Sequence, residues 1–392
     1  MTLLRCGLLA ILPWCGIAAL IMPGEVRAQD TSSEYQQTGV EAHLPVFADR
    51  LKARLTHPLS WTSGQYADFT QWKGLARTKV RESFLLPPPP APFDPVVIAE
   101  EDRGSYVARK VVLNISADSR VLGYLLVPKG EGPFPGALLL HDHGAKFDIG
   151  KEKVVRPFGE SAERMVSSRK WIERSYGGRY IGDELARRGY LCFVTDALNW
   201  GDRGGAGYDG QAQLNTNLMH MGMSLAGIIA HEDLRASEFL ADQPAVDRSR
   251  IVAVGLSMGS FRTWQVAALS DHITAGMAIC WMTTVAAQMA PGINSTKSVS
   301  AATMIHPGLF WHLDYPDIAS IACPKPMLFY NGLQDGLFAI PSVNAAYGKM
   351  RAVWRSQGAE DRLETRLWDV PHQFNRAMQE EAFAWLDRQF KR

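Results

Sequence analysis

The chain has 392 residues, of which 46% are hydrophobic and 21% are charged, and its formal net charge is +1. This composition is ordinary for a globular protein with a large core, and it suits one large α/β domain with additions as well as two domains. Lysine and arginine are scattered along the chain without the basic stripe of a nucleic-acid-binding protein, so we expect no nucleic-acid partner.

The first 28 residues predict export. Arg5 precedes an apolar run, Gly7–Met22, and the segment ends in Val26-Arg27-Ala28. A charged start, an apolar centre and small residues at the end are typical of a cleavable signal peptide. We expect residues 1–28 to be removed and the mature protein to be periplasmic or secreted, with an uncleaved N-terminal anchor as the alternative. No later segment is long and apolar enough to cross a bilayer.

The cysteines predict no disulfide framework. Cys6 and Cys15 lie in the signal segment, which leaves Cys192, Cys280 and Cys323. Three cysteines without close spacing fit neither a disulfide scaffold nor a zinc motif. Buried thiols are favoured, and a Cys280–Cys323 bridge stays open for an oxidising compartment.

Residues 29–95 predict an N-terminal helical arm followed by a connector. Apolar residues recur at helical spacing over 41–57, and several aromatic residues follow in the next thirty positions. The proline-rich stretch 87–95 cannot continue a helix and predicts an extended connector. We therefore place the catalytic domain at residues 96–392.

Strands and helices alternate through that domain. A hairpin is predicted at 106–113 and 120–128, and an apolar run at 136–140 predicts a strand buried on both faces. Further strands are predicted at 191–195, 251–254, 275–281, 327–330 and 363–370. Helices are predicted at 180–188, 215–240, 258–269, 341–354 and 375–390. This alternation predicts an α/β fold with a mostly parallel, doubly wound sheet that is covered by helices on both faces.

A candidate nucleophile lies between one such strand and the helix after it. The segment Gly255-Leu256-Ser257-Met258-Gly259 has the pattern and the setting of a nucleophile elbow. Glycines keep the backbone clear of a serine in a strained turn, and the helix start offers free N–H groups to an oxyanion. We predict Ser257 as the nucleophile and the Met258 N–H as an oxyanion donor.

The partners of this serine are predicted after two later strands. A serine needs a base, and the base needs a carboxylate that orients it. His372 follows the last strand and Asp335 follows strand 327–330, in the order that this fold uses. The alternatives are a surface histidine and a turn aspartate. Asp314 and Asp317 lie away from strand ends and are weaker candidates.

The loop after strand 136–140 should complete the oxyanion hole. It reads His141-Asp142-His143-Gly144-Ala145, and we predict the Ala145 N–H as the second donor, with His143 and Gly144 lining the substrate site. Histidines two residues apart could also bind zinc. No third ligand with convincing spacing follows, so we expect no metal.

Two insertions lie where strands end, which is where α/β sheets bind ligands. Residues 146–178 are polar and charged, and residues 283–322 are rich in aromatic residues that include Trp311. They predict either a solvated loop with a packed cap, or a lid that offers aromatic and cationic contacts to a polar acyl or sugar ester. Trp200, after another strand, is predicted either to line the same cleft or to be structural.

The chain resembles the α/β-hydrolase superfamily, in the dienelactone-hydrolase-like branch that includes acetyl-xylan-esterase-like enzymes. The resemblance covers roughly Tyr106 to the C-terminus, and the arm lies outside it. Its motifs are His143-Gly144-Ala145, Val246–Ile251, Gly255–Gly259, Asn331–Asp335 and Pro371-His372. It implies serine hydrolase chemistry without a cofactor. Dienelactone hydrolases usually have a cysteine where this chain has Ser257, so that particular activity is not implied.

Together these patterns predict an exported serine hydrolase that cleaves a carboxylic ester of a small molecule or carbohydrate through an acyl-enzyme on Ser257. One alternative is a serine peptidase or amidase of the prolyl-oligopeptidase type, although the arm is too short for the propeller of those enzymes. The other is a catalytically inactive relative that binds a ligand, which the three filled triad positions disfavour. The oligomeric state and the exact substrate stay open.

Overall fold

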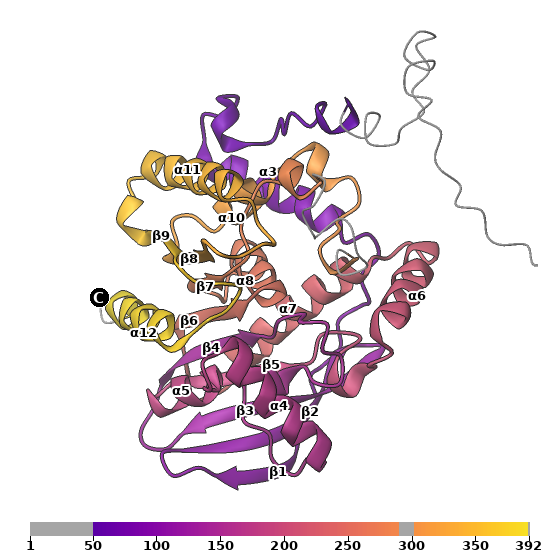
Figure 1. The fold of residues 1–392 in the computed structure, drawn as a ribbon, viewed down its shortest axis with the longest axis vertical. Helices are drawn as coiled ribbons and strands as arrows, with labels where there is room; N and C mark the ends of the chain where they lie inside the picture. Colours follow the sequence, from indigo (N-terminus) through magenta and orange to yellow (C-terminus); the bar gives the residue numbers. More distant parts are fainter. Residues whose placement is uncertain (1–49, 290–301, 391–392) are drawn as a thin grey trace, which may run out of the picture. The chain divides into compact units, whose positions relative to one another are not determined.

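The computed structural model describes residues 50–289 and 302–390, and the residues from Lys52 onward belong to one compact unit. Its strands are β1 (Val96–Asp102), β2 (Tyr106–Ser116), β3 (Ser119–Pro128), β4 (Phe134–Leu140), β5 (Leu191–Thr195), β6 (Val246–Leu256), β7 (Ala275–Ile279), β8 (Met327–Gly332) and β9 (Leu363–Trp368). They form one nine-stranded sheet in the order β1-β2-β3-β5-β4-β6-β7-β8-β9 (Figure 1).

The direction of the strands divides the sheet into two parts. The pairs from β1 to β5 are antiparallel, and all pairs from β5 to β9 are parallel. This confirms the predicted mostly parallel sheet and the predicted hairpin before it. Strand β1 was not predicted, because it is an edge strand whose residues are mostly exposed and show no apolar alternation.

Helices cover both faces of this sheet (Figure 1). They are α3 (Phe69–Glu82), α4 (Ala162–Ser175), α5 (Ile181–Arg187), α6 (Gly207–His220), α7 (Leu225–Ala241), α8 (Met258–Leu269), α9 (Val285–Gln288), α10 (Tyr315–Ser320), α11 (Ile340–Ser356) and α12 (Arg376–Phe390). Alternate residues of β6 enter two different cores: Ile251 and Ala253 pack with α7, α8 and α11, whereas Val252 and Val254 pack with α5 and α12. Strands buried on both faces in this way are continuous apolar runs, which is the pattern that the sequence showed.

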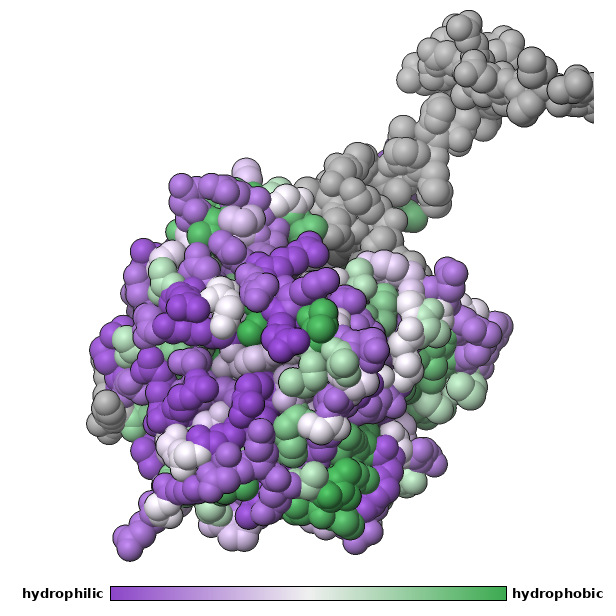
Figure 2. Space-filling model, turned by 60° about the horizontal axis from the view of Figure 1, so that its bottom comes forward, coloured by the Kyte–Doolittle hydropathy of each residue, from purple (hydrophilic) through white to green (hydrophobic). Residues whose placement is uncertain are grey.

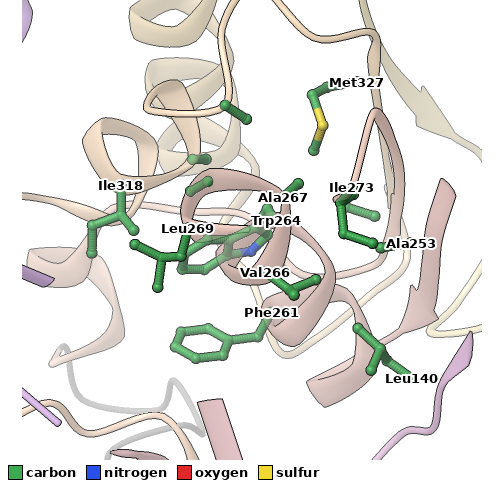
Figure 3. Packing of buried hydrophobic residues seen from close by; sticks show 14 of the residues in the cluster. Leu140, Ala253, Phe261, Trp264, Val266, Ala267, Leu269, Ile273, Ile318 and Met327 are labelled. Atoms are coloured by element: carbon green, nitrogen blue, oxygen red, sulfur yellow. The ribbon is translucent and has the colours of Figure 1, made fainter. Parts of the chain in front are cut away.

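Helix α8 is the most completely buried of the long helices. All of its residues are buried, and Figure 3 shows Phe261, Trp264 and Leu269 packed among side chains of neighbouring elements. Large aromatic side chains in such a core contribute much of the packing free energy. The start of α8 is therefore held firmly at the edge of the sheet.

The N-terminal arm secures the other end of α8. In α3, Trp72, Ala76 and Val80 are fully buried in the same core. Arg77 Nε donates to the Ala268 carbonyl (2.8 Å), and Arg81 Nη2 donates to the Leu269 carbonyl (2.9 Å). Cationic donors at a helix C-terminus satisfy its free carbonyls and oppose its dipole. The described part of the arm from residue 52 is thus packed into the same compact unit as the sheet, and most of the predicted helix at 41–57 lies outside the described residues.

Two predicted segments differ from the structure. The single helix predicted at 215–240 is divided into α6 and α7, because Gly222 has φ +75° and Ser224 caps α7 by accepting the Gly227 N–H (3.0 Å). The insertion at 146–178 is not a simple loop, since it contains α4 and a 3-10 turn at Lys151–Lys153. Serine at an N-cap signals such a boundary, but a continuous apolar pattern masked it.

The described cysteines and helices resolve two further expectations. Cys192, Cys280 and Cys323 are buried and free, so the Cys280–Cys323 bridge does not form. No helix within residues 50–289 and 302–390 has the length and apolar character needed to cross a membrane. The predicted signal peptide lies outside these residues.

The surface is mostly hydrophilic on the face drawn in Figure 2, with smaller hydrophobic patches. Exposed apolar residues include Val96, Val97 and Ile98 of the edge strand β1. The rest of that strand carries Glu100, Glu101 and Asp102. Charges on an edge strand disfavour edge-to-edge pairing between molecules.

Candidate active site

Ser257 occupies the sharp turn between β6 and α8. Its backbone has φ 59° and ψ −124°, a strained conformation for a residue other than glycine. Its N–H donates to the Ile279 carbonyl (2.8 Å), which holds the turn against β7. A methyl group on Gly255 would overlap the backbone of Gly259, and one on Gly259 would overlap the Leu140 carbonyl oxygen. Both glycines are therefore required for the turn.

His372 and Asp335 meet at the carboxyl ends of two adjacent parallel strands. Asp335 follows β8, His372 follows β9, and these strands pair directly. His372 Nδ1 donates to Asp335 Oδ2 (2.6 Å), while Asp335 Oδ1 accepts the Leu337 N–H (3.0 Å). The Asp335 side chain is buried and that of His372 is 27% exposed. This geometry fixes the proton on Nδ1 and leaves Nε2 able to accept one.

One cavity connects the three predicted catalytic residues. Ser257, Asp335 and His372 all line a cavity of about 450 Å³, and so do Met258 and the loop His143-Gly144-Ala145. A cavity of this volume matches the size of small-molecule sites. The structure thus brings together the predicted triad positions and both predicted oxyanion segments.

The two predicted oxyanion donors differ in their availability. Met258 is the first residue of α8, where a helix leaves its N–H groups without intrahelical partners. The Ala145 N–H, in contrast, donates to His143 Nδ1 (3.0 Å). The prediction of a free Ala145 donor is corrected accordingly: this N–H could serve an oxyanion only if that bond were shared or released.

His143 is a neutral, positioned side chain. Burial, and then the charge of Lys153, lowers the pKa of His143 to about 4. Its Nδ1 accepts the Ala145 N–H, and its Nε2 lies 3.2 Å from Gln211 Oε1. Since an amide oxygen only accepts, the Nε2 atom carries the proton. His143 therefore braces the loop of residues 141–145, named the oxyanion loop for its predicted role, and is no base at neutral pH.

Lys153 is hydrogen-bonded to the same loop, a role that the sequence did not indicate. It is fully buried, and its Nζ donates to the carbonyls of Asp142 (2.8 Å) and His143 (2.9 Å). The Asp142 carboxylate accepts from Trp171 Nε1 (3.1 Å) and from the Tyr176 hydroxyl (2.8 Å). Burial lowers the pKa of Lys153. Only the packing of the 3-10 turn beneath the loop reveals this role.

Two clusters among the described residues could in principle hold a metal ion. One consists of Glu152, Asp196 and Asp202, and the other of Cys280, Asp335 and His372. In the first, Lys151 Nζ is within 2.8 Å of all three carboxylates, so an ammonium group already occupies the centre of the cluster. In the second, Asp335 and His372 are hydrogen-bonded to each other, so these two candidate ligands already have partners.

Two predicted lining residues lie elsewhere. Trp200 is fully buried, with Nε1 donating to the His143 carbonyl (3.2 Å), and Trp311 is 47% exposed on a 3-10 turn. Neither lines the cavity: Trp200 has the structural one of its two predicted roles, whereas the predicted lining role of Trp311 is wrong. Both insertions nevertheless contribute: Trp171 and Arg174 come from the first, and Met304 from the second. The remaining aromatic lining residues are Tyr208, Trp281 and Phe338.

Buried histidines make stability depend on pH. Burial lowers the pKa of His143 to about 4 and that of His306 to about 3, against about 6.5 in an unfolded chain. Below pH 6.5 the unfolded state binds more protons, so the free energy of unfolding falls as pH falls. Each histidine should remove about 2 kcal/mol between pH 7 and pH 5. Urea unfolding of the wild type and of His306→Gln at both pH values tests this: the variant should lose about 2 kcal/mol less, and equal losses would contradict it.

The parallel sheet, the strained turn at Ser257 and the His372–Asp335 pair are the features of an α/β-hydrolase. The chain belongs to the Abhydrolase family, whose model matches residues 52–359. The match includes residues 52–95 with α3, so this part of the arm, which the resemblance in the sequence had left out, belongs to the region that the family shares. The match ends before His372, and the assignment of that residue therefore depends on its geometry.

Individual proteins resemble the chain at lower identity. YtaP of Bacillus subtilis (strain 168), named as a hydrolase, is 25% identical over 265 residues, which are 67% of this chain and 81% of YtaP. A protein of Bacteroides fragilis NCTC 9343 described as an acetyl xylan esterase superposes with a TM-score of 0.64 at 18% identity, covering 81% of each chain. A glucuronoyl esterase from Solibacter usitatus gives a TM-score of 0.61 at 14% identity, covering 85% of this chain and 97% of that one. These structural likenesses show the shared fold.

Proposed function

We propose that the protein is a serine hydrolase that cleaves carboxylic esters through an acyl-enzyme on Ser257. The observation that carries this proposal is the His372 Nδ1–Asp335 Oδ2 bond of 2.6 Å in the same cavity as the serine of the elbow turn. A serine hydroxyl is a weak nucleophile until a base takes its proton, and an oriented imidazole is that base. The family to which the chain belongs supports hydrolysis as the reaction.

The reaction has two steps. His372 Nε2 takes the Ser257 proton while Oγ attacks the ester carbonyl, and Asp335 stabilises the imidazolium that forms. The Met258 N–H stabilises the oxyanion. His372 then protonates the leaving alcohol, and water repeats the sequence on the acyl-enzyme to release the acid and the free serine.

We propose that the substrates are polar esters, including sugar esters. Its walls combine aromatic faces from Trp171, Tyr208 and Trp281 with polar groups from Gln334 and Arg174, and flat aromatic surfaces with a few placed polar groups suit such ligands. The structural neighbours named as acetyl xylan and glucuronoyl esterases support the same class of substrate.

Labelling with a fluorophosphonate probe tests the nucleophile. The probe should form a covalent adduct that peptide mass spectrometry places on Ser257, because the base beside it makes that hydroxyl reactive. His372→Ala should abolish labelling, and the exposed His220→Ala should not. An adduct on another residue, or full labelling without His372, would overturn the proposal.

We also propose that the protein is exported and that residues 96–392 carry the catalysis. Arg5, the run Gly7–Met22 and Ala28 support export. N-terminal sequencing of protein recovered outside the cytoplasm should begin at residue 29. A chain that retains Met1 would contradict cleavage.

A further inference from the structure

Arg174 is a charged group in the catalytic cavity that the proposed reaction does not use. It lies in the last turn of α4 and lines the cavity, with its guanidinium 5.4 Å from the ring centroid of Trp171. Within residues 50–289 and 302–390, Arg174 has neither an ion pair nor a hydrogen bond from its side chain. An arginine side chain stays protonated and offers five N–H donors.

The other charges of the cavity wall are already balanced. Asp335 is bonded to His372. Asp142 is buried, accepts from Trp171 and Tyr176, and lies 3.7 Å from the Lys153 ammonium. Among the described lining residues, Arg174 is therefore the one fixed charge that a ligand could neutralise.

The helix turn that carries Arg174 is held from two sides, while the Arg174 side chain itself is exposed to solvent. Trp171, one turn earlier in α4, donates to Asp142 and lies so close to Gly144 that a methyl group there would overlap its ring. At the end of α4, the Ser175 carbonyl accepts the Phe374 N–H (2.8 Å), two residues beyond His372. The Arg174 side chain thus starts from a helix end that adjoins both the predicted oxyanion loop and the loop of the predicted catalytic base, and it lines the same cavity as Ser257.

We propose that Arg174 selects esters whose acyl or alcohol part carries a negative charge, a carboxylate above all. This inference deepens the proposed function and depends on it. A guanidinium can donate two parallel N–H bonds to one carboxylate. Its contact with the Trp171 ring already restricts its orientation, so binding a carboxylate costs less conformational entropy. A neutral ester has no negative group to pair with the Arg174 guanidinium. Of two esters that differ only in charge, the enzyme should therefore prefer the anionic one.

Two pairs of chromogenic or fluorogenic esters test the acyl and alcohol sides separately. On the acyl side, mono-4-nitrophenyl succinate is compared with 4-nitrophenyl methyl succinate. On the alcohol side, 4-acetoxybenzoate is compared with its methyl ester. For each pair the ratio of kcat/KM, anionic over neutral, is measured for the full chain and its variants, so that differences in intrinsic reactivity cancel between enzymes.

In Arg174→Gln the ratio should fall about tenfold for at least one pair, since a hydrogen bond to a charged group is lost. Arg174→Lys should retain part of the preference, and Arg169→Gln, exposed on the same helix and outside the cavity, should leave the ratio unchanged. Raising the ionic strength should reduce the wild-type ratio, because salt screens partly exposed charges.

The outcomes separate this inference from the proposed function. If wild type cleaves the esters and Ser257→Ala does not, but Arg174→Gln changes neither ratio, the selection of anionic esters is overturned and the serine hydrolase stands. If no ester is cleaved, or Ser257→Ala cleaves them as well as wild type, the proposed function is overturned and the inference with it.

Discussion

Ser257→Ala should lower kcat for ester hydrolysis by about 10⁴-fold or more. The variant removes only the hydroxyl oxygen, and its backbone must adopt the same φ of 59°, so the strain of the turn is unchanged. Of the described cavity-lining residues with a hydroxyl, which are Ser175, Tyr208 and Ser257, only Ser257 lies in the elbow turn at the start of α8. The oxyanion donor and the binding site remain and should leave a small residual activity.

The measurement pairs initial rates on a 4-nitrophenyl ester with thermal unfolding. The melting temperature of Ser257→Ala should stay within about 2 °C of wild type. The hydroxyl lines a cavity, so its removal leaves no new void in the packed core. Ser249→Ala, at an exposed position near the start of β6, is the matched control and should keep full activity. Activity within tenfold of wild type in Ser257→Ala would remove this serine from the mechanism.

Gly259→Ala should damage both the fold and the activity. Its new methyl group would overlap the Leu140 carbonyl oxygen of β4. Neither can rotate away, because the methyl carbon is attached directly to Cα and the oxygen belongs to the backbone of a core strand. We expect a loss of about 3 kcal/mol or more in the free energy of unfolding, together with an activity loss of about 10²-fold, because the elbow must shift to relieve the overlap.

Gly348→Ala is the control for this substitution. Gly348 lies in the exposed face of α11, and a methyl group there has no heavy atom within 4 Å. Alanine in a helix interior should stabilise the protein by about 0.5–1 kcal/mol. Urea unfolding of both variants separates the steric effect from the helix preference. Equal stabilities in Gly259→Ala and wild type would show that β4 and α8 are more loosely packed than the structure has them.

Elements with a local signal could be predicted from the sequence. The strand at 251–254, the glycines around Ser257 and the helix at 258–269 are adjacent in the chain, and the structure confirms the secondary structure as β6 and α8. The same reasoning placed Asp335 and His372 at strand ends, because parallel strands end at one edge of a sheet. The distance between these two side chains could not be predicted, since it depends on the pairing of β8 with β9.

Features that depend on long-range packing could not be predicted. Lys153 acquires its role only when the 3-10 turn packs beneath the oxyanion loop, and the bond from Ala145 to His143 depends on a φ of 52° at Ala145. Trp200 resembled a lining residue because it follows a strand, but it is covered by His143 and Phe147. The sequence contains no marker that distinguishes a tryptophan behind a loop from one in front of it.

The contacts between α3 and α8 limit how the protein can be shortened. A fragment that begins at residue 96 would leave the Ala268 and Leu269 carbonyls without the guanidinium donors of Arg77 and Arg81. It would also uncover the apolar surface that Trp72 now fills. A minimal recombinant enzyme should therefore keep the chain from residue 52, and affinity tags or fusion partners belong upstream of that point.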